Sequence, residues 1–275
     1  MAYKLKLFIK YSGGIANENI LSLHELSQSL NGLSRALSIT NNILIENGRI
    51  TKRNSWKKRD TPVRYYVSPS KTGSFIEIIS IVFEEPAVRM IGSSVIGAVF
   101  WDMLKFTWKS AVGINSSVET PYSKNIIDRN PELPEEVSKV LESPLADLHR
   151  PIQSNHDMKI EVVRPRVGTL LKYDKGTFDY VNATSASIST PGIVGNITKY
   201  NNLTGYGRFY SDELGRTVPF NLAKGLGYQD IKLLSQSLHE SNQDVLAGKV
   251  RIVAKITKTN NGNIKRYKIE GVEGL

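Results

Sequence analysis

The heptapeptide Thr204-Gly205-Tyr206-Gly207-Arg208-Phe209-Tyr210 decides how the C-terminal part of this chain is interpreted. Neighbouring residues of a β-strand point to opposite faces, so Tyr206, Arg208 and Tyr210 are predicted to share one face. Gly207 and Phe209 then share the other. An arginine is costly to bury without a partner, which predicts that its face is exposed and that Phe209 belongs to the core. Exposed rings between glycines let nucleic-acid bases stack, whereas the simpler interpretation is a twisted hairpin whose glycines relieve crowding.

Strand patterns and turn residues alternate on both sides of this heptapeptide. We expect three strands at 193–200, 205–210 and 217–220, a helix at 229–240, and two strands at 249–258 and 264–270. Asn261-Gly262 supplies a hairpin turn between the last two strands. Three strands, a helix and two strands is the order of the OB-fold. Residues 185–275 are therefore predicted to form an OB-like β-barrel domain with one helix.

The N-terminal part predicts a sheet packed with a long helix. Residues 3–12 alternate like a strand, and two further strands are expected at 62–68 and 74–83. The intervening helix ends at Asn47-Gly48, and Ser22 and Glu25 have the spacing of a capping box at its start. One apolar stripe runs along this helix: Leu23, Leu26, Leu30, Leu33, Leu37 and Leu44. No heptad charge pattern accompanies the stripe, so packing on the sheet is favoured over a coiled-coil seam.

The expected fold class is α+β, with two domains. A chain of 275 residues exceeds the usual size of one domain, and the predicted division separates an α+β domain, 1–184, from the barrel. Within the first domain we expect a surface connection at 115–134, short helices at 135–141 and 144–150, and a strand at 158–163.

The most apolar stretch of the chain spans residues 87–113. A membrane span needs about 20 apolar residues with few charges. Four charges interrupt this stretch: Arg89, Asp102, Lys105 and Lys109. A buried or amphipathic helix is therefore predicted, and insertion into a membrane after a trigger is kept as the alternative.

The chain carries a formal charge of +10, which favours polyanionic partners such as nucleic acid or nucleotides, although a basic balance also serves solubility alone. Lys249, Arg251 and Lys255 share one face of a predicted strand, with Lys265 across the hairpin. A second basic segment, 49–59, contains one aromatic residue among its cations, a composition that suits a clamp on a nucleic-acid strand. The candidates in this segment are Arg53, Trp56 and Lys57. Together with Tyr206, Arg208 and Tyr210, these residues are the candidate nucleic-acid-binding set.

Nothing in the sequence has the pattern of an active site. It has no phosphate-binding glycine loop, no G-x-S-x-G turn and no cysteine. His149 and His156 lie near Asp147 and Asp157, but their spacing matches no ligand signature, and a surface loop is the favoured interpretation. We therefore expect a non-enzymatic protein without a metal or another cofactor. The N-terminus lacks a signal-peptide pattern, which together with the absence of cysteine predicts a cytoplasmic protein.

Two resemblances accompany these inferences. Gly205-Tyr206-Gly207, Phe209 and residues 215–220 resemble the nucleic-acid-binding strands of cold-shock barrels, although Thr204 replaces a lysine and Arg208 displaces the second aromatic residue. The whole chain resembles an uncharacterised bacterial family through three motifs: Tyr11-Ser12-Gly13-Gly14-Ile15-Ala16, Asn31-Gly32-Leu33-Ser34-Arg35-Ala36 and Lys71-Thr72-Gly73-Ser74-Phe75. The family resemblance implies no known activity and a link to phage-defence loci, and it transfers no functional residues.

The leading hypothesis is a non-enzymatic nucleic-acid- or nucleotide-binding component of a prokaryotic assembly. Its partners would be nucleic acid or nucleotide and a protein partner or second copy of the chain, with no stable membrane association. The first alternative is a membrane-acting effector that uses residues 87–113. The second alternative is a structural subunit that binds only proteins.

Overall fold

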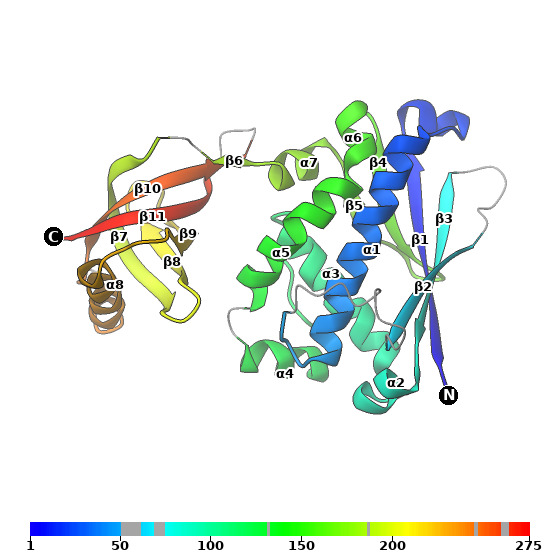
Figure 1. Cartoon of the computed structure of the whole chain (residues 1–275), viewed down its shortest axis with the longest axis horizontal. Coiled ribbons are helices and arrows are strands. Elements are labelled where there is room, and N and C mark those ends of the chain that lie inside the picture. The colour runs from blue at the N-terminus through cyan, green and yellow to red at the C-terminus, as the bar shows by residue number, and fades with distance from the viewer. Residues whose placement is uncertain (51–61, 69–74, 131–132, 186–187, 245–246, 260–263) are drawn as a thin grey trace. The chain divides into compact units, whose positions relative to one another are not determined.

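The computed structural model of the chain describes residues 1–50, 62–68, 75–130, 133–185, 188–244, 247–259 and 264–275 (Figure 1). The fold is α+β, as the sequence predicts. The chain divides into two compact units, Met1–Val181 and Asn182–Leu275, whereas the sequence places the division between residues 184 and 185. Each unit is described by itself.

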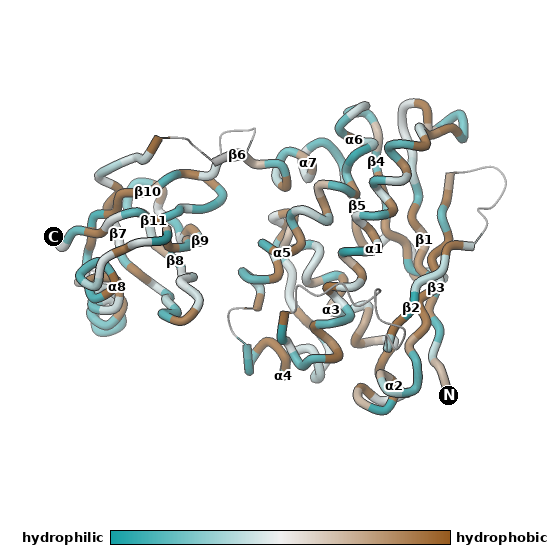
Figure 2. Tube along the Cα trace, viewed as in Figure 1, coloured by the Kyte–Doolittle hydropathy of each residue, from teal (hydrophilic) through white to brown (hydrophobic). Residues whose placement is uncertain are grey.

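The N-terminal unit is built on a five-stranded antiparallel sheet in the order β2-β3-β1-β4-β5. Its strands are β1 (Tyr3–Ser12), β2 (Val63–Ser68), β3 (Ile76–Phe83), β4 (Lys159–Arg164) and β5 (Gly168–Tyr173). β1 lies at the centre and is the strand predicted at residues 3–12. Lysines alternate with apolar residues at its start (Figure 2). β4 confirms the expected strand at 158–163, whereas β5 was not predicted.

Helices cover one face of this sheet (Figure 1). They are η1 (Gly14–Glu18), a short 3-10 helix, followed by α1 (Leu23–Ile45), α2 (Glu85–Ile91), α3 (Ile96–Ala111), α4 (Pro121–Arg129), α5 (Leu133–Leu148), α6 (Arg150–Ser154) and α7 (Lys175–Val181). α1 packs against α5 and α3 and forms side-chain hydrogen bonds to the sheet. Ser29 Oγ lies 2.8 Å from the Tyr11 hydroxyl, and Asn41 Nδ2 donates to the Tyr65 hydroxyl at 2.8 Å. Burial raises the pKa of Tyr65 to about 12.

The leucine stripe of α1 enters the core through its C-terminal two thirds. Leu33, Leu37 and Leu44 are buried, whereas Leu23 is 82% exposed. The helix ends at Ile45, and the Asn47-Gly48 pair that follows has positive φ angles of 53° and 92°, as predicted for a helix stop. The predicted capping box is wrong, because the Ser22 side chain forms no capping hydrogen bond.

A glycine permits the close approach of α1 and α5. A Cβ atom on Gly32 would lie 2.4 Å from the Pro144 carbonyl oxygen and 2.5 Å from the Leu148 nitrogen. α5 also corrects the prediction of two short helices at 135–141 and 144–150, because it continues through Pro144 to Leu148. Pro144 is buried, so its packing stabilises a position that lacks a backbone N–H to donate.

The apolar stretch 87–113 forms two helices, not the single helix expected. α2 ends at Gly92, which has a φ of 100°, and α3 starts at Ile96 with its axis bent by 84° from that of α2. The apolar side chains of α3 belong to the core, and Trp108 Nε1 donates to Thr40 of α1 at 2.9 Å. Within the described residues no single helix has the length and hydropathy of a membrane span; α2 and α3 reach that threshold only when counted together.

The surface connection expected at 115–134 contains a helix, because a buried carboxylate anchors its start. Asp102 of α3 is 7% exposed. It accepts hydrogen bonds from the backbone nitrogens of Glu119 and Thr120 at 2.9 and 2.8 Å, and from the Thr120 hydroxyl at 2.7 Å. Thr120 in turn caps α4 by accepting from the Ser123 nitrogen. Asp102, one of the charges that interrupt the apolar stretch, therefore holds the start of α4 by hydrogen bonds.

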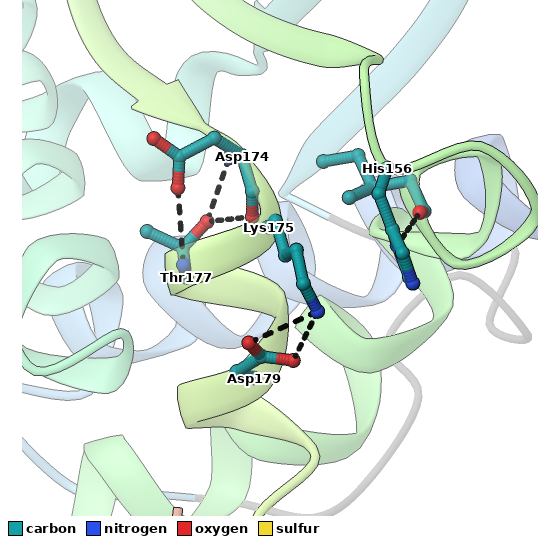
Figure 3. A network of polar contacts seen from close by, with 6 residues as sticks. His156, Asp174, Lys175, Thr177 and Asp179 are labelled. Carbon is teal, nitrogen blue, oxygen red and sulfur yellow. Dashed lines mark hydrogen bonds and ion pairs between the residues drawn. The ribbon is translucent and has the colours of Figure 1, made fainter. Parts of the chain in front are cut away.

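α7 starts with a reciprocal pair of hydrogen bonds, shown in Figure 3. Asp174 Oδ1 accepts from the Thr177 nitrogen at 3.1 Å, and Thr177 Oγ1 accepts from the Asp174 nitrogen at 2.8 Å. One turn further, Lys175 lies beside the buried carboxylate of Asp179. This pattern resembles a capping box and fixes the position of the Thr177 hydroxyl beneath His149.

His149 is fully buried, which corrects the surface-loop interpretation for this residue. Its Nδ1 lies 2.6 Å from the Leu145 carbonyl oxygen, and its Nε2 lies 3.0 Å from Thr177 Oγ1. A carbonyl only accepts, so the hydrogen bond to Leu145 assigns the proton to Nδ1, while the Thr177 hydroxyl that faces Nε2 donates to the Asp174 carbonyl oxygen at 2.9 Å. The ring packs on Tyr173 with a centroid distance of 4.8 Å. His156, in contrast, is exposed, as expected.

The C-terminal unit is a closed barrel of five strands. They are β7 (Thr190–Asn201), β8 (Tyr206–Ser211), β9 (Arg216–Leu222), β10 (Val250–Lys258) and β11 (Ile264–Gly274), with β6 (Thr184–Ser185) added beside β10. The order around the barrel is β7-β8-β9-β11-β10, and pairing of β10 with β7 closes it. Only the β9–β11 pair is parallel among these strands. α8 (Tyr228–Ser241) lies between β9 and β10 in the chain, so the unit is OB-like, as predicted.

We expect the N-terminal unit to lose stability as the pH falls below 6.5, because of His149. Burial lowers the pKa of His149 from 6.5 to about 4. The unfolded chain therefore takes up a proton below pH 6.5 that the folded unit excludes until about pH 4, and the free energy of unfolding falls by about 3 kcal/mol across this window. Urea unfolding followed by tryptophan fluorescence measures this loss, because the three tryptophans, Trp56, Trp101 and Trp108, all precede residue 182.

The control is His149→Gln, which retains hydrogen-bonding groups but does not titrate. Its stability is expected to depend less steeply on pH than that of the natural chain between about pH 4 and 6.5. Equal slopes for the two proteins contradict a neutral, buried His149.

Candidate nucleic-acid interface

The predicted alternation along β8 is confirmed. Phe209 is fully buried and packs edge-on against Tyr267, with a centroid distance of 5.9 Å. Gly207 is buried as well, whereas Tyr206 and Arg208 are partly exposed and Tyr210 is 38% exposed. Tyr206, Arg208 and Tyr210 therefore lie together on the outer surface of the barrel; we name them the β8 face.

The strand register extends the β8 face onto its two neighbours. On β7, Lys199 pairs with Arg208 and Asn201 pairs with Tyr206. On β9, Thr217 is the partner of Tyr210. Directly paired residues lie on the same face of a sheet, so Lys199 adds a second cation beside Arg208. Sequence reasoning missed Lys199, because strict alternation places it on the face of the buried Ile193 and Ile197. The register shift between Ile197 and Lys199 turns it outward.

Close packing explains why residue 207 of β8 is a glycine. A Cβ atom on Gly207 would lie 2.2 Å from the Lys199 carbonyl oxygen and 2.4 Å from the Phe220 ring. The alternative interpretation, in which glycines relieve crowding, is therefore correct for this residue. It does not explain the two rings, because Tyr206 and Tyr210 point away from the crowded side.

The loop between β7 and β8 borders the β8 face and was not singled out from the sequence. Asn201 Oδ1 accepts hydrogen bonds from the backbone nitrogens of Leu203 and Thr204, at 2.7 and 3.2 Å. Leu203 is 90% exposed at the tip of this loop. The Asn201 side chain thus holds the loop in one conformation and presents an apolar side chain to solvent.

The three predicted cations on and just before β10 share the outward face, as predicted, but carboxylates neutralise them. Arg251 lies 3.7 Å from Glu273, Lys255 lies 3.2 Å from Glu270, and Lys249 contacts Asp212. Hydrogen bonds from Ser189 and then from Lys255 lower the pKa of Glu270. The sequence could not show these pairs, since they depend on the register between β10 and β11 and on the turn after β8.

Lys265 does not lie on the surface as the sequence suggested. It is only 9% exposed, because it shares the inward phase of β11 with Tyr267 and Ile269. Three further candidates, Arg53, Trp56 and Lys57, lie outside the described residues. In the part of the chain that the structure describes, no group of three or more His, Asp or Glu side chains is arranged to hold a metal ion.

These features define a two-domain α+β protein with a C-terminal OB-like barrel. A family model described as a domain of unknown function (DUF7946) matches residues 7–182, and the chain belongs to that family. A second model, described as a family of unknown function (DUF7947), matches residues 191–273. Comparisons with curated proteins and with solved structures gave no match. Neither family description carries the link to phage defence that the sequence resemblance implied.

Truncation of Phe209 is expected to lower the free energy of unfolding of the barrel more than truncation of Tyr210 does. Removing a fully buried phenylalanine costs about 3–5 kcal/mol, whereas a surface substitution changes stability by about 0.5 kcal/mol. Hydrogen exchange of the amides of β8 and β9 in Phe209→Ala and Tyr210→Ala measures both effects within this unit. Similar loss of protection in the two variants contradicts the division between core and surface along β8.

Proposed function

We propose that this protein is a non-enzymatic nucleic-acid-binding component that holds a single strand on the β8 face of its barrel. The observation that carries this proposal is the alternation along β8. It directs Tyr206, Arg208 and Tyr210 outward, while Gly207 and Phe209 complete the core. Two rings that flank an arginine supply both groups that bind a nucleic-acid strand without regard to sequence.

The position of this face in the barrel supports the proposal. β8 and β9 are the second and third strands of an OB-like order, and the loop between the first two strands lies beside them. In OB-folds this strand face and this loop contact oligonucleotides. Bases would stack on Tyr206 and Tyr210, and Arg208 and Lys199 would contact phosphates.

The remaining predicted residues have smaller roles in this proposal. Lys249, Arg251 and Lys255 already pair with carboxylates, so phosphate must compete with those carboxylates for them. Lys265 contributes nothing, because it is buried. We propose an extended strand as the ligand in preference to a free nucleotide, since the two rings offer separate stacking positions.

The wider hypotheses from the sequence are part of the proposal too. We propose a cytoplasmic protein that works within a prokaryotic assembly, with a role in phage defence as the sequence resemblance implies. Membrane insertion of residues 87–113 is not favoured. The apolar side chains of α3, including Phe100, Leu104 and Trp108, form the core of the N-terminal unit and would have to leave it. A purely structural subunit is the outcome that remains if no nucleic acid binds.

Tyr206→Ala is expected to weaken binding of a labelled, mixed-sequence single-stranded oligonucleotide about tenfold. Loss of one stacked base costs about 1–3 kcal/mol. Fluorescence polarisation at low and moderate salt measures the affinity, which is expected to fall steeply with salt because phosphate contacts release counterions. A mononucleotide is expected to compete only weakly.

Tyr206→Phe and Tyr228→Ala are the matched controls. The first retains the ring, and the second removes a tyrosine that is 78% exposed at the start of α8, away from β8 in the chain. Both variants should bind as the natural protein does. Absence of binding by the natural protein at low salt, or equal weakening by Tyr206→Ala and Tyr228→Ala, refutes the proposal.

A further inference from the structure

The sheet of the N-terminal unit has one face that no described helix covers. The long helices α1, α3 and α5 lie on the opposite side (Figure 1). The alternation along β1 buries Leu7, Ile9 and Tyr11 beneath the helices, so the intervening residues of β1 point to the open side. The pairing registers then place side chains of the other four strands on the same side. We name this surface the open sheet face.

Basic side chains dominate the open sheet face. They come from four of its five strands and are Lys4, Lys6, Lys10, Arg64, Lys159 and Lys172. Glu161 is the only carboxylate that the described strands place among them, and it pairs with Lys10 at 3.6 Å. Arg64 lies 3.5 Å from Glu84, which follows β3. For the other four cations, the described part of the chain shows no ion pair.

This distribution differs from that of the barrel strand singled out from the sequence. Lys255 of β10 pairs with Glu270, and Lys249, just before β10, pairs with Asp212, whereas Lys4, Lys6 and Lys172 are exposed and form no ion pair within the described residues. The open sheet face therefore offers more uncompensated positive charge than the predicted basic strand. A solvated face of an antiparallel sheet has no physical need for charge of one sign, so this bias calls for an anionic partner.

Apolar and aromatic side chains lie among the cations of the open sheet face, in its middle and on its edge strand β2. Phe8 of β1 is partly exposed and lies directly between Ile78 of β3 and Val163 of β4. Tyr66, on the edge strand β2, is 51% exposed and pairs with Ser80. Two strand spacings across and two residues along separate the rings of Phe8 and Tyr66 by about 12 Å, so separate bases can stack on them.

We propose that the open sheet face is a second binding surface for single-stranded nucleic acid. Rings on β1 and β2, with cations beside them, match the bases and the phosphates of one extended strand. A second copy of the chain is a poorer occupant, because a two-fold axis would place the same lysines opposite one another. An anionic membrane would satisfy the lysines but provides no group that stacks on Phe8 and Tyr66.

This inference does not depend on the β8 face, because it rests on another unit of the chain. Each surface would bind alone. A strand long enough to engage both would bind with greater avidity, since the second contact becomes intramolecular.

The test uses the full-length chain and a labelled 20-nucleotide polyuridine. The variant Lys6→Glu/Lys172→Glu reverses two exposed cations, and Lys124→Glu/Arg129→Glu makes the same change of net charge on α4, in the helical layer. We expect at least a tenfold loss of affinity for the first variant and less than a threefold loss for the second. The dependence of log affinity on log salt should become shallower by about 1.4 for the first variant only, because two phosphate contacts are lost.

A second readout on the natural protein avoids any effect of substitution on folding. Bound polyuridine should slow acetylation of Lys4, Lys6, Lys159 and Lys172, measured by mass spectrometry, and leave Lys124 unchanged. Equal losses of affinity in the two charge-reversal variants, or equal acetylation of these lysines with and without polyuridine, overturn the inference. Association with vesicles of anionic lipid in the absence of polyuridine binding overturns it as well.

The experiments test the two proposed surfaces independently of each other. If Tyr206→Ala abolishes binding and the Lys6→Glu/Lys172→Glu variant binds normally, the β8 face stands and the open sheet face does not. The reverse result removes the β8 face and retains the open sheet face. If each variant loses part of its affinity, and the losses add when the substitutions are combined in one chain, both surfaces are supported.

Discussion

Strand pairing on both sides of β1 is the constraint on which the N-terminal unit depends. β1 forms antiparallel pairs with β3 and β4, so its backbone donors and acceptors are used on two edges. Once its phase is set by Leu7 and Ile9, the registers determine which side chains of the other strands face the helices and which face away. The core and the open sheet face are therefore two results of one alternation, and a shift by a single residue would exchange them.

Some local parts of this fold were predictable from the sequence, although the capping box at Ser22 was wrong and β5 was missed. The parts that depend on distant contacts were not predictable. The alternation of lysine with leucine predicts β1, and Asn47-Gly48 predicts the end of α1, because both patterns act within a few residues. α4 was missed because its start depends on Asp102, which lies in another helix. His149 was placed on the surface because the sequence does not show that Leu145 and Thr177 supply its two hydrogen bonds.

The candidate sites divide in the same way. The outward direction of Tyr206 and Tyr210 follows from strand alternation and was predictable. The sequence also shows that Lys249, Arg251 and Lys255 share a face, but not that carboxylates from β11 and from the turn after β8 neutralise them. Counting lysines therefore identifies basic strands. The pairing register decides on which of these strands the positive charge is left without a carboxylate and can attract an anionic ligand.

Closure of the barrel has a consequence for how this chain can join other proteins. Each of the five barrel strands has a hydrogen-bonded neighbour on both sides, so none of them offers a whole edge to an incoming strand. In the N-terminal sheet, β2 and β5 each have one neighbour among the described strands. β-augmentation by a partner, in which a foreign strand extends a sheet, would find longer edges there than at the two-residue strand β6, which also has one neighbour. Addition at β2 would lengthen the surface that carries Tyr66 and Arg64, so an assembled sheet would present a wider platform than one chain provides alone.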